Sequence, residues 1–120
     1  HPQYGVSSFW YGKLLAELDR AREAEPHLRR ALEIYSDTYG EEDAWSLDAQ
    51  IELGSALSSL GESLEAERLL LGAKTAAGDG SEQHLAALEA LARHYEATGR
   101  NDAARENRRL LEQLTSAAPQ

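Results

Sequence analysis

Residues 53–73 read LGSALSSLGESLEAERLLLGA, and this stretch decides the fold. Its small and apolar residues stand at Leu53-Gly54, Leu57, Gly61, Ala66, Leu70 and Ala73. The pattern also occurs 42 residues earlier, as Tyr11-Gly12, Leu15, Asp19, Ala24, Leu28 and Ala31, and 38 residues later, as Leu91-Ala92, Tyr95, Gly99, Ala104, Arg108 and Leu111. A period in this range predicts a stack of similar supersecondary units. Function is then expected in the surface that the stack presents.

Each copy contains two stretches with helical spacing. Leu53, Leu57 and Leu60 fall at i, i+4 and i+7, and Ala66, Leu70 and Ala73 step by 4 and 3. No alternating β-branched run indicates a strand. We predict an all-α chain with helices at about residues 3–17, 20–38, 43–60, 63–77, 81–97 and 101–116. These form three antiparallel helix pairs in a single domain, with repeats at about residues 1–42, 43–80 and 81–116.

Three kinds of residue refine this prediction. Asp19, Gly61 and Gly99 stand between the two helices of each copy, where a residue able to adopt positive φ is expected to end the first helix. Gly12 and Gly54 lie inside helices, where glycine costs ~1 kcal/mol relative to alanine unless close packing compensates. We therefore expect the two helices of a pair to approach closely at these glycines. Pro26 is expected to kink the second helix.

Composition limits the classes of function. The net charge is -9, and such an acidic excess repels phosphate backbones, so no nucleic-acid partner is expected. The chain has no cysteine, which excludes disulfides and thiolate metal sites. Its longest apolar runs, such as 69–71, are far shorter than the roughly 20 residues of a membrane span. We expect a soluble, cytoplasmic chain with no membrane contact.

A search for catalytic or metal-binding patterns finds none. The histidines stand at 1, 27, 84 and 94, and His84 and His94 are too far apart in sequence to share a helix face at i, i+4, so each is predicted to be a lone surface histidine. The serines at 55, 58, 59 and 63 are not near a histidine in sequence. Gly78 and Gly80 lack the lysine and strand of a phosphate loop. We expect no enzymatic activity, no metal and no cofactor.

The repeated residues resemble the tetratricopeptide repeat, over nearly the whole chain. The segments Ala24-Glu25-Pro26, 30–35 and 39–43 are similar to its kinesin-light-chain variety. The third copy departs from the pattern at Ala92 and Arg108. The resemblance implies a right-handed superhelix of helix pairs, an α-solenoid, whose concave groove is lined by the first helix of each pair and recognises proteins or peptides.

Carrying the family's lining positions onto this chain predicts the groove residues. They are Phe9, Trp10, Lys13, Asp48, Ile51, Glu52, Ser55, Glu89, Arg93 and Glu96. Family members that clamp acidic chaperone tails use basic and amide residues where this chain has Phe9, Glu52 and Ala86, so that ligand is not expected. Apolar and acidic groups together predict a ligand segment with hydrophobic anchors and some basic residues.

Two simpler interpretations of these residues remain open. Phe9 and Trp10 would serve equally well as packing residues at a repeat boundary. The carboxylates would be ordinary members of a solvated helix face in a chain this acidic. Trp45 is predicted to pack against the preceding helix.

The alternative function is a structural, self-association or intramolecular docking segment of a larger protein, such as a bacterial signalling protein. His1-Pro2 stands at the same place in the repeat as Asp43-Ala44 and is similar to the His-Pro of the loop between repeats in this variety. We therefore expect that an earlier repeat has been removed and that the chain is a fragment. Half of the aromatic residues lie in the first 11, at Tyr4, Phe9, Trp10 and Tyr11, which suggests a homodimer through the N-terminal aromatic end. The last helix has the polar exterior expected of a terminal cap.

Overall fold

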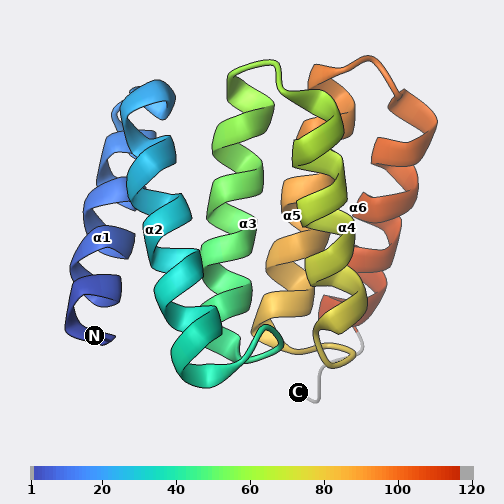
Figure 1. Cartoon of the computed structure of the whole chain (residues 1–120). Coiled ribbons are helices and arrows are strands. Elements are labelled where there is room, and N and C mark those ends of the chain that lie inside the picture. The colour runs from blue at the N-terminus through green and yellow to red at the C-terminus, as the bar shows by residue number, and fades with distance from the viewer. Residues whose placement is uncertain (1, 117–120) are drawn as a thin grey trace.

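The computed structural model describes residues 2–116, and the prediction of an all-α chain is confirmed over this range. The helices are α1 (Pro2–Glu17), α2 (Ala21–Tyr39), α3 (Ala44–Ser59), α4 (Ser63–Ala76), α5 (Glu82–Ala97) and α6 (Asn101–Ser116), as drawn in Figure 1. Each of these ends lies within one residue of its predicted place. His1, on which part of the fragment prediction depends, lies outside the described residues.

The turns inside the helix pairs follow the predicted chemistry. Asp19, Gly61 and Gly99 have φ values of 62, 82 and 78°, so all three adopt the left-handed conformation that ends a helix. Between pairs, Asp43 caps α3 by accepting a hydrogen bond from the backbone of Trp45 at 2.9 Å. The helix α2 continues through Pro26, which lies in its second turn.

The six helices form three antiparallel pairs that stack side by side (Figure 1). The backbone of α3 approaches both α1 and α5. Within residues 2–116 the backbones of α2, α4 and α6 do not approach one another, although the Arg29–Glu65 ion pair links α2 to α4 and Lys74 donates to Asn107 between α4 and α6. The stack is therefore closer packed along α1, α3 and α5, which form its inner face. The helices α2, α4 and α6 form the outer face.

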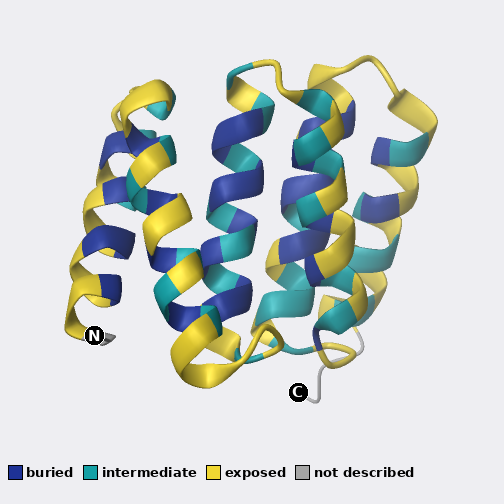
Figure 2. Ribbon diagram, viewed as in Figure 1, coloured by how far each residue is buried: buried dark blue, intermediate teal, exposed yellow. Residues whose placement is uncertain are grey.

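The apolar core follows the interfaces between helices, as the buried residues in Figure 2 show. One cluster joins α1 and α2 to α3 and includes Leu28, Tyr35 and Leu57. A second joins α3 and α4 to α5 and α6 and includes Leu70 and Leu91. Both clusters contain residues of α3 and α4, so the first and the third pair each bury apolar surface against the second.

The predicted close approach at the repeated glycines is present. A Cβ added to Gly12 would lie 2.8 Å from Cγ of Leu28, and one added to Gly54 would lie 2.8 Å from Cγ of Leu70. Both leucines are fully buried on the second helix of the pair. In the third pair, Ala92 takes the place of glycine and is fully buried. In the first two pairs, a leucine side chain of the second helix thus packs directly on the glycine backbone of the first helix, in the space that a Cβ would occupy.

Candidate functional site

The inner face has three connected hollows along α3. The first, which we call the aromatic pocket, has a volume of about 380 Å³ and lies at the start of α3. It is lined by Phe9, Trp10, Lys13, Trp45, Asp48, Ile51, Glu52, Glu82, Gln83 and Ala86. A second hollow of about 700 Å³ shares Glu52 with the first. A third of about 280 Å³ shares Ser55, Ser59 and Arg93 with the second. Together they form an inner groove that follows α3 over its length.

The aromatic residues of the pocket divide into buried and exposed ones. Phe9 is only 5% exposed, and its ring contacts that of Tyr35 with centroids 6.2 Å apart. Trp10 on α1 is 54% exposed and Trp45 on α3 is 44% exposed. Of the predicted groove residues, Trp10 presents an exposed ring to the groove. Phe9 and Ile51 are buried and pack beneath the groove.

Trp45 was predicted only to pack against the preceding helix. That contact is confirmed, because its ring centroid lies 5.6 Å from that of Tyr35 on α2. The same indole also lines the aromatic pocket. One signal in the sequence could have revealed this second role: Trp45 precedes Asp48 by three residues, so the two share a helix face.

Charge in the pocket is unevenly compensated. The ammonium of Lys13 lies 5.2 Å from the ring centroid of Trp10 and 6.0 Å from that of Phe9. Asp48 accepts a hydrogen bond from the amide of Gln83 at 3.1 Å, and burial raises the pKa of its carboxyl. Burial also raises the pKa of Glu52, which accepts no hydrogen bond from any residue in the described part of the chain. Both carboxylates are thus poorly solvated, and Asp48 has one neutral partner whereas Glu52 has no hydrogen-bond partner among the described residues.

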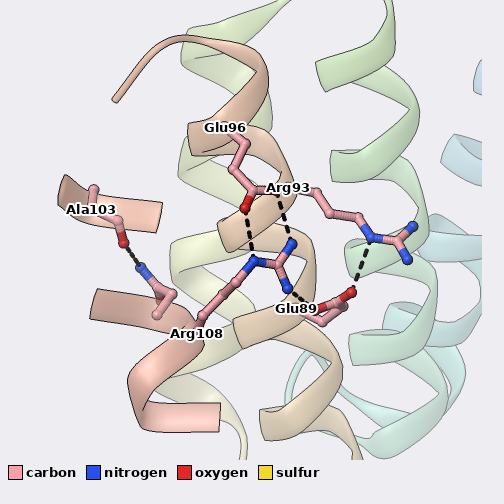
Figure 3. Close-up of polar contacts among 6 residues, drawn as sticks. Glu89, Arg93, Glu96, Ala103 and Arg108 are labelled. Atoms are coloured by element: carbon pink, nitrogen blue, oxygen red, sulfur yellow. Dashed lines mark hydrogen bonds and ion pairs between the residues drawn. The ribbon is translucent and has the colours of Figure 1, made fainter. Parts of the chain in front are cut away.

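The carboxylates predicted at the third repeat are already paired. Arg108 on α6 donates to both oxygens of Glu96, at 2.8 Å each, and to Glu89 at 3.0 Å (Figure 3). Arg93 also donates to Glu89, at 3.1 Å. The bond from Arg108 lowers the pKa of Glu96. Neutralised in this way, Glu89 and Glu96 add little free negative charge to the groove, contrary to the expectation of acidic groups open to a ligand.

Comparison with known families identifies the fold. The family model described as tetratricopeptide repeat matches residues 6–73, which is more than half of the chain. The chain belongs to the tetratricopeptide repeat family. Comparison with curated proteins gave no match, and neither did comparison with solved structures. The matched range comprises the first two helix pairs, and α5 with α6 adds a third pair of the same form. The kinesin-light-chain variety stays a prediction.

The prediction that His94 is a surface histidine is wrong. His94 is 1% exposed, and its Nδ1 lies 2.7 Å from the hydroxyl of Ser58 on α3. Burial lowers the pKa of the imidazole. A serine next to a histidine is also the beginning of a hydrolytic site, but among residues 2–116 no carboxylate bonds to this ring to orient it. The pair therefore connects α3 to α5, in keeping with a repeat family that is not catalytic.

Other features of this tetratricopeptide repeat chain are less suited to binding. A hollow of about 500 Å³ lies between α2 and α4 on the outer face. Of the two arginines that line it, Arg29 donates to Glu65 through two hydrogen bonds of 2.9 Å, and Arg68 lies 3.8 Å from the same carboxylate, so the inner groove is the better candidate. In the described range, no group of three metal-binding side chains occurs. None of the helices found there is long and apolar enough to cross a membrane.

Proposed function

We propose that the three repeats act as one domain whose inner groove binds a polypeptide segment with apolar anchors and basic residues. Tetratricopeptide repeats generally mediate protein–protein interaction. The observation that carries this proposal is the pair of half-exposed indoles, Trp10 and Trp45, which line one pocket from two different repeats. Exposed tryptophans in a concave site are typical binding hot spots.

The energy available from the two indoles is substantial. A large aromatic side chain buries ~150–250 Å² when it is covered, so roughly 100 Å² of each half-exposed ring remains to be buried. At ~25 cal/mol per Å², this is about 2–3 kcal/mol for each ring, before the entropic cost of association. Two such rings can support micromolar binding only together with further contacts along the groove.

The charge of the groove favours a basic ligand. Asp48, Glu52 and Glu82 line the aromatic pocket, where Lys13 is the one basic residue among its lining residues. The whole chain carries a net charge of -9, which adds a long-range attraction for a cationic segment. An acidic segment would meet unpaired carboxylates and would be rejected.

The proposal is tested by selecting binders from a displayed library of random dodecapeptides and measuring their affinity by fluorescence anisotropy. Trp10→Ala and Trp45→Ala are each expected to weaken binding of the selected peptides by about tenfold or more. Leu64→Ala is the matched control, because Leu64 is 88% exposed on the outer helix α4. Equal affinities for all four proteins would contradict binding in the inner groove.

The α1 surface favours a second candidate role, which is self-association. Tyr4, Tyr11 and Leu14 share one face of α1, Leu18 follows directly after the helix, and all four are 50–62% exposed. This face carries no formal charge, so two acidic chains could meet there without direct repulsion. Light scattering over a dilution series should then show a dimer that Leu14→Glu abolishes. A parent chain that is monomeric at the highest concentration would rule out this role.

A further inference from the structure

We propose that the aromatic pocket is a site for the cationic side chain of a lysine or arginine in the bound segment, and that Lys13 occupies this site in the free protein. The ligand's cation would displace the Lys13 ammonium. This assignment rests on the proposed function, because it requires the bound segment to lie in the inner groove.

The position of Lys13 is the first observation. Its ammonium lies within 6.0 Å of the ring centroids of both Trp10 and Phe9, which is the geometry in which an aromatic ring attracts a cation. Among residues 2–116, no carboxylate oxygen lies within 4.0 Å of this ammonium. The lysine is therefore held by the rings and by the field of more distant charges. Lacking an ion pair, it can leave by rotation of its flexible stem.

The carboxylates of the pocket are the second observation. Asp48 has a single hydrogen bond, from the neutral amide of Gln83, and Glu52 has none among the described residues. Glu82 also lines the pocket and makes no ion pair within the described range. The second hollow, which shares Glu52, is also lined by Arg20, Arg22 and Arg93; Arg20 pairs with Glu23 and Arg93 donates to Glu89, and within the described range none of the three makes an ion pair with Glu52. Three carboxylates thus line a pocket that contains one ammonium. The pocket is therefore negatively charged overall, and a further cation would neutralise part of this charge.

The contrast with the third repeat shows that this imbalance is local. There, Arg108 binds Glu96 through two hydrogen bonds and also reaches Glu89, so both carboxylates have an arginine from the same chain. In the aromatic pocket no arginine has this role. An apolar side chain placed in the pocket would cover Asp48 and Glu52 without giving them a partner, whereas a lysine or arginine would pair with them.

The two tryptophans of the chain, Trp10 and Trp45, both line the pocket, so intrinsic fluorescence reports its occupancy directly. The probes are two blocked pentapeptides, acetyl-Ala-Leu-Lys-Leu-Ala-amide and its norleucine analogue, which retains the aliphatic stem and lacks the ammonium. The lysine peptide is expected to bind about tenfold or more tightly than the norleucine peptide. Titration of both peptides into each protein gives the dissociation constants.

Three variants separate recognition of the ligand's cation from displacement of Lys13. Lys13→Met retains the stem and removes the competing cation, so it should tighten binding of the lysine peptide by about three- to tenfold and leave the norleucine peptide unchanged. Glu52→Gln should weaken only the lysine peptide. Lys74→Met is the matched control, because it removes the other lysine of the chain, on the outer helix α4, and tests whether net charge alone explains the gain. Thermal melting confirms that each variant is folded.

Each outcome has one meaning. Equal binding of the two peptides would overturn the cation site and leave groove binding standing. Weaker or unchanged binding of the lysine peptide to Lys13→Met, or an equal gain in Lys74→Met, would overturn displacement of Lys13. Absence of a fluorescence change with both peptides up to millimolar concentration would contradict the cation site and the proposed groove together.

Discussion

Replacing Gly54 by alanine tests the close approach of the paired helices. The new Cβ would lie 2.7 Å from Cδ2 and 2.8 Å from Cγ of Leu70, with the backbone oxygen of Ala66 at 3.4 Å. Leu70 is fully buried, so its branch has to move within a packed core. Overpacking of this kind costs ~1–3 kcal/mol. Alanine recovers ~1 kcal/mol of helix propensity, and we expect a net loss of about 1 kcal/mol.

For a chain of this length, a loss of that size lowers the melting temperature by about 3–6 °C. Circular dichroism at 222 nm measures the transition, with Gly72→Ala as the control. Gly72 is also inside a helix, but its added Cβ would meet only Nε2 of Gln50, the movable end of a flexible side chain, at 2.9 Å. That nitrogen donates to the backbone oxygen of Leu69 at 2.7 Å and has to shift, so the melting temperature of Gly72→Ala should fall less than that of Gly54→Ala or rise.

A double-mutant cycle strengthens the test. Leu70→Ala alone leaves a cavity and costs about 2–5 kcal/mol. Combined with Gly54→Ala, the new methyl group occupies part of that cavity, so the double variant should lose less stability than the sum of the two single losses. If Gly54→Ala melts at or above the temperature of the parent, or if the two substitutions are additive, the close-approach account is incorrect.

Three titratable residues give further predictions, each measured as melting temperature against pH. Burial raises the pKa of Glu52, so the charged carboxylate reduces the stability of the folded state above that pKa. Glu52→Gln should therefore have a higher melting temperature than the parent at pH 7. A lower melting temperature would contradict the cost assigned to the buried charge. Burial lowers the pKa of His94, so the parent should lose stability as pH falls below about 6.5. His94→Gln, whose amide can still hydrogen-bond with Ser58, should lose less stability over the same range. Parallel profiles would be inconsistent with a buried neutral imidazole. Arg108 lowers the pKa of Glu96, so the ion pair stabilises the folded state at pH 7 and this contribution is lost as pH falls through the lowered pKa. Arg108→Ala should therefore reduce the melting temperature at pH 7, and the difference from the parent should shrink as the carboxyl is protonated at acid pH. A difference that does not change with pH would show that the ion pair is not its cause.

Most of the fold could be predicted because its signals are local in sequence. Helix spacing and the left-handed residues Asp19, Gly61 and Gly99 each depend on a few neighbouring residues, and the structure has them where the pattern placed them. The close approach at Gly12 and Gly54 could be inferred because a small residue recurs at one place in each repeat, as glycine in the first two and as Ala92 in the third.

The site was less predictable because its contacts join different repeats. Ser58 and His94 are 36 residues apart, and neither has a local feature that indicates the other. Arg108 interrupts the apolar pattern, but the sequence did not show that it would bind Glu89 and Glu96 on the neighbouring helix. Helical spacing predicts which residues share a helix face. The contacts that this face makes depend on how the helix pairs stack, which the spacing does not show.

The central claim is that the inner groove binds another polypeptide, and nuclear magnetic resonance tests it most directly. A ¹⁵N-labelled chain gives two indole signals, from Trp10 and Trp45, together with backbone amide signals from every helix. Addition of a library-selected peptide should shift both indole signals and the amides of α1 and α3 around Lys13 and Glu52, with little change around Leu64 on α4. Shifts confined to the outer helices, or to the face of α1 that contains Leu14, would contradict the claim.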